Sequence, residues 1–179
     1  MSESRTLRLN YADWLRDVPD FPKPGIVFKD ISPLLQDGEA FAACIQDLAE
    51  VARAHGPTRI AGIESRGFLF GTALAVELGL GFVPIRKPGK LPWQTFAESY
   101  ELEYGQDTLE IHTDASAAGE AVYLIDDLLA TGGTAEAAVK LIRRTGAEVV
   151  GCGFVVELGF LNGRDALHGL SVDSLHHID

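Results

Sequence analysis

The sequence predicts an α/β protein built on a doubly wound, mainly parallel sheet. Short apolar, β-prone runs alternate with stretches of helical periodicity along the chain. The runs are residues 59–63, 81–85, 122–125 and 149–156, and the helical stretches are 38–54, 68–78 and 135–144. Uninterrupted apolar runs are typical of parallel strands buried on both faces, and strands alternating with helices favour the doubly wound arrangement. At 179 residues and 46% hydrophobic, the chain suits one domain, 1–179.

A short amphipathic helix is expected first. Its apolar positions recur at helical spacing before Pro19 ends the pattern: Tyr11, Trp14, Leu15 and Val18. Prolines keep the chain irregular from there to the β-branched residues 26–27. After the helix at 38–54, the helix at 68–78 should stop at Gly79, and Pro84 favours an edge or an end for the strand at 81–85.

The segment 86–98 is expected to be a long surface loop, because it contains two prolines and a glycine and has no periodicity. Residues 100–104 and 108–112, separated by Gly105-Gln106-Asp107, are expected to form a hairpin. The stretch after Gly163 is patterned too weakly to predict an element.

Residues 122–134 carry the strongest functional signal. The apolar run leads into Asp126 and Asp127 and then into a loop of hydroxyls and glycines before the helix. Open α/β sheets bind ligands at the carboxyl ends of their strands. Glycines there let backbone N–H groups approach a phosphate, and a helix N-terminus adds favourable partial charge. The pattern predicts a phosphosugar site in which the acids reach sugar hydroxyls or a metal-bound water.

Other phosphate motifs fit less well. A P-loop needs Gly-Lys-Ser/Thr, whereas Thr134 and an alanine follow Gly133. The Gly-x-Gly pairs that start at Gly79 and Gly151 lack the third glycine of a dinucleotide fingerprint. Helix capping remains the alternative for the acids and threonines taken singly.

Residues 126–134 resemble the phosphoribosyl-diphosphate (PRPP) signature of type I phosphoribosyltransferases, in the form Asp-Asp-Leu-Leu-Ala-Thr-Gly-Gly-Thr that is typical of the adenine-specific members. Further segments resemble those enzymes in the same order: 21–35, 64–68, 86–92 and 100–105. The resemblance implies a small N-terminal hood that binds the base, in residues 1–35, and a flexible catalytic loop at 86–104. It also implies purine salvage, with phosphoribosyl transfer from PRPP to adenine giving AMP and diphosphate. A phosphoribosyltransferase for xanthine, guanine or hypoxanthine, or a non-catalytic PRPP-binding regulator, is the alternative.

The resemblance assigns roles to individual residues. The PRPP and AMP contacts would be Asp126, Asp127, Leu129, Ala130, Thr131, Gly132, Gly133 and Thr134. The diphosphate contacts would be Ser65, Arg66, Lys87 and Lys90, with a cis peptide bond in the first of these loops. The adenine contacts would be Val27, Phe28, Lys29 and Leu158, and the catalytic residues Glu103, Arg66 and Asp127. Lys29 replaces the arginine that is common at its position, and so replaces a planar fork with a point charge.

The charge distribution limits the partners. A net charge of −11 argues against nucleic acid or an anionic membrane as the main partner. An anionic substrate would need a local basic patch, and Arg86, Lys87 and Lys90 form the densest one.

Cysteines and histidines indicate no metal centre. Cys44 and Cys152 lie in apolar segments and are expected to be buried, reduced thiols, and the five histidines lack metal-ligand spacing. The resemblance implies Mg²⁺ as cofactor, held mainly by the substrate rather than by a dedicated protein cage, and a homodimer. No apolar run is long enough to span a membrane, so we expect a cytoplasmic protein.

Overall fold

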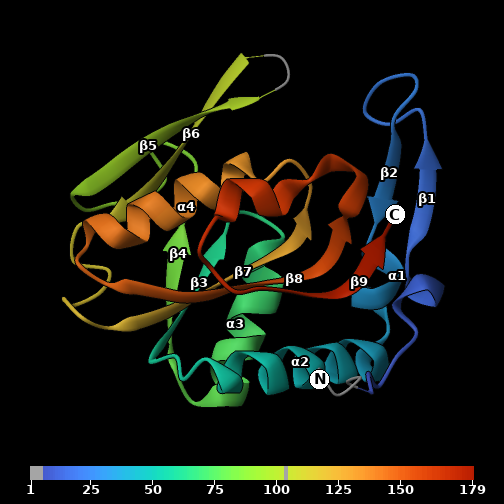
Figure 1. Cartoon of the computed structure of the whole chain (residues 1–179), viewed down its shortest axis with the longest axis horizontal. Helices are drawn as coiled ribbons and strands as arrows, with labels where there is room; N and C mark the ends of the chain where they lie inside the picture. The colour runs from blue at the N-terminus through green and yellow to red at the C-terminus, as the bar shows by residue number, and fades with distance from the viewer. Residues whose placement is uncertain (1–5, 103–104) are drawn as a thin grey trace.

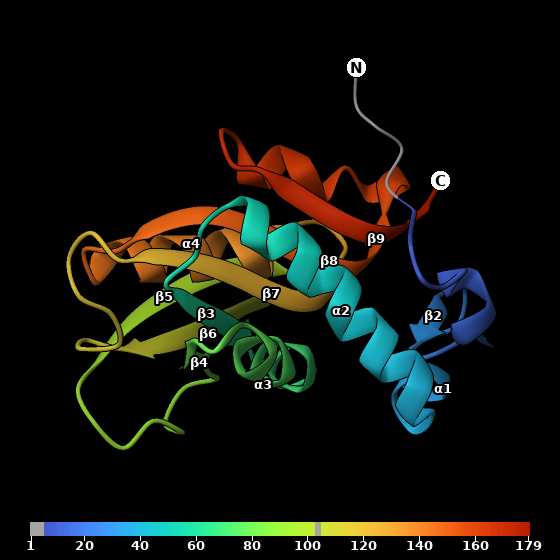
Figure 2. The ribbon, with the colours of Figure 1, turned by 90° about the horizontal axis from the view of Figure 1, so that it is seen from below.

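The computed structural model describes residues 6–102 and 105–179. In these residues, five parallel strands form the central sheet in the order β4-β3-β7-β8-β9. They are β3 (Arg59–Ile63), β4 (Gly81–Ile85), β7 (Ala121–Leu129), β8 (Glu148–Leu158) and β9 (Val172–Ile178). Figures 1 and 2 show helices α2 (Gly38–Ala54) and α3 (Gly67–Leu78) on one face and α4 (Gly133–Arg144) on the other. The predicted doubly wound fold is confirmed.

The side chains of β7 explain why the strand is apolar at successive positions. Val122 and Leu124 pack into the core under α4, whereas Tyr123 and Ile125 pack into the core under α2 and α3. All four are fully buried. Successive side chains of a strand point to opposite faces, so a sheet covered on both sides requires apolar residues at every position.

Single residues account for one edge of the sheet and for two helix ends. β4 lies at the edge of the sheet, as Pro84 predicted, because an edge strand can do without one backbone donor. Gly79 ends α3 in the left-handed conformation, with φ +68°. The carboxylate of Asp37 caps α2 by accepting from the N–H groups of Glu39 and Ala40 at 3.0 and 2.9 Å.

The N-terminal helix prediction is wrong beyond Trp14. A 3₁₀ turn, η1 (Tyr11–Trp14), is followed by strand β1 (Arg16–Pro19), which pairs antiparallel with β2 (Val27–Asp30) ahead of the short helix α1 (Ser32–Gln36). Ion pairs join the two strands: Arg16 to Asp30 at 2.5 Å and Asp17 to Lys29 at 2.7 Å. The paired residues are 12 to 14 positions apart in the sequence. Their pairing stabilises a strand in a segment for which the local spacing of apolar residues had predicted a helix.

The predicted hairpin is present, but its first strand is longer than expected. It consists of β5 (Thr95–Leu102) and β6 (Gly105–His112), so the loop predicted at 86–98 ends before Thr95 and the expected turn residues 105–107 belong to β6. The hairpin turns its apolar side toward α4, where Tyr100, Leu109 and Ile111 are buried in one core. Burial against α4 therefore extends the strand into a segment without local periodicity.

Two further differences concern the C-terminal ends of strands. β7 runs to Leu129, so Asp126 and Asp127 lie inside the strand rather than after it, because β8 extends far enough to pair Leu129 with Glu157. The unpatterned tail contains the short turns η2 (Gly159–Leu161) and η3 (Gly163–Leu167) and strand β9, which pairs with β8 at the sheet edge.

The two thiols lie as predicted, since Cys44 and Cys152 are both buried and free. None of the helices in the described residues has the length and apolarity needed to cross a bilayer.

Candidate functional site

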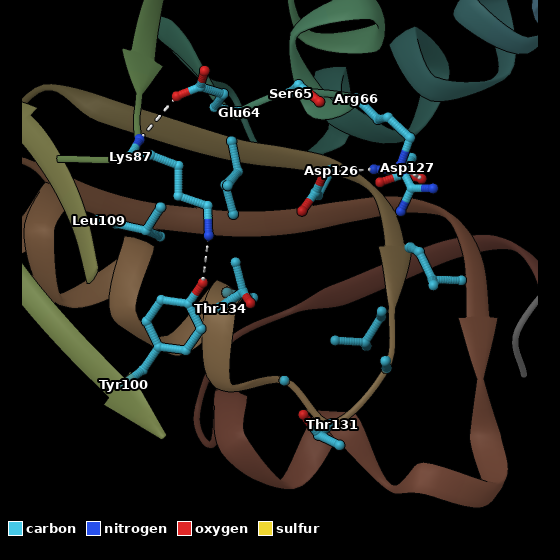
Figure 3. A pocket seen from close by; sticks show the side chains of 16 residues that line it. Glu64, Ser65, Arg66, Lys87, Tyr100, Leu109, Asp126, Asp127, Thr131 and Thr134 are labelled. Atoms are coloured by element: carbon cyan, nitrogen blue, oxygen red, sulfur yellow. Dashed lines mark hydrogen bonds and ion pairs between the residues drawn. The ribbon is translucent and has the colours of Figure 1, made fainter. Parts of the chain in front are cut away.

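The candidate site lies where the chain leaves the sheet in two directions. From β3 the chain passes through α3 to β4 on one side, and from β7 it passes through α4 to β8 on the other. Ligands of open α/β sheets bind at such a switch point, outside the carboxyl ends of the strands. A cavity of about 530 Å³ opens there (Figure 3). Its lining residues are Ile63, Glu64, Ser65, Arg66, Lys87, Tyr100, Leu109, Asp126, Asp127, Leu128, Leu129, Ala130, Thr131, Gly132, Thr134 and Ala135.

The loop from Ala130 to Thr134 forms one end of the cavity. Gly132 is the N-cap of α4 and has φ +87°, a conformation that glycine adopts without strain. Because a glycine has no side chain, nothing on the N-cap residue itself occupies the first N–H groups of the helix, which favour an anion. Of the residues predicted to contact PRPP, all but Gly133 line the cavity, and Gly133 begins α4 beside them.

Two acidic side chains form part of the cavity wall. Asp127 is 5% exposed, and its Oδ2 lies 2.9 Å from Nε of Arg66. Burial raises the pKa of both carboxyls; the charge of Asp127 raises that of Asp126 further, while Arg66 opposes the rise at Asp127. Gly67 allows α3 to approach, because a Cβ there would lie 2.7 Å from Oδ1 of Asp126. Buried acids with raised pKa values in a cavity are candidates for substrate contact.

A second loop suited to anions lies at the other end. Ser65 and Arg66 lie in the short turn between β3 and α3, and the peptide bond between Glu64 and Ser65 is cis, as the resemblance implied. Figure 3 shows these residues across the cavity from Thr131. One cavity thus holds two strand–loop–helix junctions, each able to hold an anion.

Carboxylates hold the basic side chains next to the cavity. Glu64 accepts from Lys90 Nζ at 2.7 Å, from the backbone N–H of Lys87 at 2.9 Å and from Arg86 Nη2 at 3.1 Å. Burial alone would raise the pKa of Glu64, but these hydrogen bonds outweigh it and lower the pKa to about 2. Lys90 is therefore not among the lining residues, but its ion pair with Glu64 holds it beside the cavity.

Lys87 has its own carboxylate partner on the hairpin. Its Nζ pairs with Asp107, which also accepts from the Tyr100 hydroxyl at 3.2 Å. Sequence reasoning did not assign Glu64, Tyr100 or Asp107 to the site. Glu64 and Tyr100 lie in segments that carried the resemblance, so their place in those motifs was the available signal. Asp107 was expected in a turn outside the motifs.

The residues predicted to bind the base are not in the cavity lining. Val27, Phe28 and Lys29 lie on β2, and Leu158 ends β8. Phe28 lies next to a residue that does line the cavity, because the guanidinium carbon of Arg66 is 5.1 Å from the centroid of the Phe28 ring. Lys29 is paired with Asp17. Glu103, the predicted proton-transfer residue, lies outside the described residues.

Comparison with known proteins identifies relatives over most of the chain. Residues 34–169 match the phosphoribosyl transferase domain. The adenine phosphoribosyltransferase of Desulfitobacterium hafniense is 54% identical, over 93% of this chain and 96% of its own length. The crystal structure of the Thermoanaerobacter pseudethanolicus enzyme of that name superposes with TM-score 0.91 at 51% identity, covering 93% of this chain and 97% of the other.

A liganded structure is also similar. The Saccharomyces cerevisiae adenine phosphoribosyltransferase, complexed with an imino-altritol bisphosphate and adenine, superposes with TM-score 0.86 at 43% identity, covering 92% of this chain and 95% of the other.

Proposed function

The chain belongs to the phosphoribosyl transferase family, and from that premise we propose that it transfers the phosphoribosyl group of PRPP to adenine, giving AMP and diphosphate. The observation that carries the proposal is that one cavity has an anion-suited loop at each end and two acids in its wall. PRPP has a phosphate at one end of its ribose and a diphosphate at the other, which matches this arrangement. The relatives named for adenine support the choice of base.

The reaction breaks the bond between the anomeric carbon and diphosphate and forms a bond from that carbon to a ring nitrogen of adenine. The transition state resembles an oxocarbenium ion, so catalysis depends on neutralising the leaving diphosphate and on holding the reactants in line. In our proposal Arg66, Lys87 and Lys90 face the diphosphate, and the loop ending at Thr134 holds the 5′-phosphate. Asp126 and Asp127 then hold the ribose hydroxyls.

The base would stack on Phe28, next to Arg66, with backbone groups of the hood reading its amino group. Val27, Lys29 and Leu158 complete this proposed surface. We propose Glu103 for proton movement at the ring nitrogen. Phe28→Ala should then raise the apparent KM for adenine and leave that for PRPP nearly unchanged.

Mg²⁺ fits the donors available here. In the described residues no three His, Cys, Asp or Glu side chains form a group that could hold a metal ion. The cavity does present carboxylate oxygens of Glu64, Asp126 and Asp127, which are ligands of the kind Mg²⁺ takes when substrate oxygens and waters complete its shell. When bound with PRPP, the ion would neutralise charge on the leaving diphosphate.

Turnover with different bases tests the proposal. Purified protein is incubated with Mg²⁺, PRPP and adenine, hypoxanthine, guanine or xanthine, and the nucleotide is followed by chromatography. We expect AMP from adenine and little product from the others. Product mainly from another purine would favour the related enzymes, and PRPP binding without any nucleotide would favour a regulator.

We also propose a homodimer in the cytoplasm. On α3, Leu69 and Val76 are 45% and 82% exposed and line a surface cavity with Phe41 and Leu35. An apolar face of this kind is suited to a second copy of the chain. Light scattering of the wild type and Val76→Glu tests the dimer. The two buried, free cysteines support a reducing compartment.

A further inference from the structure

An ion pair between a buried glutamate and a half-exposed arginine lies behind the cavity, between β8 and η3. The side chain of Glu157 is 3% exposed. Arg164 donates from Nε to Oε1 at 2.6 Å and from Nη2 to Oε2 at 2.7 Å, and the hydroxyl of Ser174 donates to Oε2 at 2.7 Å. The remaining guanidinium nitrogen, Nη1, donates to the carbonyl of Val172 at 2.8 Å. One planar fork therefore attaches η3 to both β8 and β9.

The residue before Arg164 supports the phosphate loop from behind. A Cβ on Gly163 would overlap the carbonyl oxygen of Ala130. A Cβ on Gly132 would in turn overlap the carbonyl oxygen of Gly163 and lie 2.7 Å from the Cβ of Ala166. The loop and η3 thus touch backbone to backbone, and neither glycine leaves room for a side chain. Ala130 and Gly132 line the cavity on their other side.

Glu157 is also linked to the start of this loop through the sheet. It is the register partner of Leu129, the last residue of β7 before the loop begins. The ion pair is therefore connected to the loop by two routes. Glu157 is paired in the sheet with Leu129, which precedes the loop, and Arg164 follows Gly163, which lies against Ala130 and Gly132.

We propose that Glu157 and Arg164 are positioning residues for phosphoribosyl transfer, which hold the loop in the shape that binds the 5′-phosphate. The inference rests on the proposed function, because it assumes that this loop binds that phosphate. The phosphate contacts of such a loop are largely backbone N–H groups, so their positions follow the backbone. The ion pair touches no substrate itself; it determines where the backbone of η3 lies, and η3 supports the loop.

Two variants separate positioning from general stability. Gly163→Ala adds one methyl group against Ala130, at a position whose backbone suits any residue. Arg164→Lys keeps the charge but loses the fork. Their matched controls are Gly38→Ala, where a Cβ meets nothing within 4 Å, and Arg53→Lys, whose half-exposed guanidinium lies 3.6 Å from Glu77.

Two fragments of PRPP, ribose 5-phosphate and inorganic diphosphate, are titrated separately by calorimetry, and melting temperatures are recorded. We expect Gly163→Ala and Arg164→Lys to weaken ribose 5-phosphate binding at least tenfold and to change diphosphate binding less than twofold. Both controls should change neither ligand by more than twofold.

The outcomes distinguish this inference from the proposed function. If the wild type binds ribose 5-phosphate and Arg164→Lys binds it equally well, the positioning role of the ion pair is overturned and the proposed function stands. If both ligands weaken in parallel with a lowered melting temperature, the pair only stabilises the fold, which also overturns the positioning role. A wild type that does not bind ribose 5-phosphate refutes the proposed phosphate site, and the inference with it.

Discussion

Replacing Glu64 by glutamine removes the charge that holds three donors beside the cavity while keeping the size of the side chain. The carboxylate accepts from Lys90, from Arg86 and from the N–H of Lys87, which lower its pKa from 4.5 to about 2. One pKa unit corresponds to about 1.4 kcal/mol, so the upper limit of the stabilisation is about 3 kcal/mol. Because Lys90 is 49% exposed, solvent screens part of its attraction to Glu64. We therefore expect Glu64→Gln to lower the free energy of unfolding by about 1–2 kcal/mol at pH 7.

The pH dependence gives a sharper test than the value at one pH. A carboxyl whose pKa is lower in the folded protein stabilises it fully above the unfolded pKa, near 4.5, and loses that stabilisation as the pH falls toward the folded pKa, about 2. The difference between wild type and variant should therefore be constant from pH 7 to about 5 and shrink below that. Urea unfolding followed by circular dichroism measures it, at each pH where the wild type is folded.

Glu77→Gln is the matched control, because Glu77 is 43% exposed and its partner Arg53 lies 3.6 Å away. An exposed pair of this kind should change the free energy of unfolding by less than about 0.5 kcal/mol. The reasoning about Glu64 is refuted if both variants lose the same stability at pH 7, or if the loss in Glu64→Gln does not diminish between pH 5 and pH 3.

Other predictions concern the reaction. Thr131→Ala should weaken PRPP binding by about 1.5–3 kcal/mol, because a hydroxyl donor to a charged oxygen is lost, and an unchanged affinity by calorimetry would remove the threonine from the site. Asp127→Asn should reduce turnover more than it reduces the melting temperature; wild-type turnover would limit the acid to a structural role. Adenine should be used far better than hypoxanthine, because hypoxanthine has a carbonyl in place of the amino group of adenine and would leave the protein acceptor for that group without a donor. Equal rates with the two bases would contradict the proposed base-binding surface. If the segment 86–99 closes over bound PRPP, its amide exchange should slow when PRPP and an adenine-site ligand bind, and equally slow exchange without ligand would exclude such closure. Glu103→Gln should lower turnover with PRPP affinity nearly intact, and full turnover would exclude proton transfer by this residue.

Some of the fold could be predicted because its cause is local. The alternation of apolar strands with amphipathic helices reflects burial on both faces of a sheet, which every strand of that sheet repeats. Gly79 and Pro84 act through their own backbone conformations, and both were placed correctly. The signature from Asp126 to Thr134 is also local, since one strand end and one helix start contain all the groups that it needs.

The elements that were predicted wrongly, with wrong bounds or not at all depend on distant partners. β1 exists because β2 pairs with it, and β5 begins at Thr95 because the hairpin packs on α4. β9 forms at the edge offered by β8. In each case the segment has weak or misleading periodicity of its own, and a contact remote in sequence decides its conformation.

The same division holds for the site. The sequence by itself determined which loops could hold anions, because glycines, hydroxyls and arginines at strand ends have those properties wherever the strands lie. Only the tertiary structure decided that the loops after β3 and β7 share one cavity, since that follows from the order of the strands. It alone also decided that Glu64 holds Lys90 and that Glu157 holds Arg164. An ion pair depends on where the folded chain brings two side chains together, and no local pattern of residues encodes that distance.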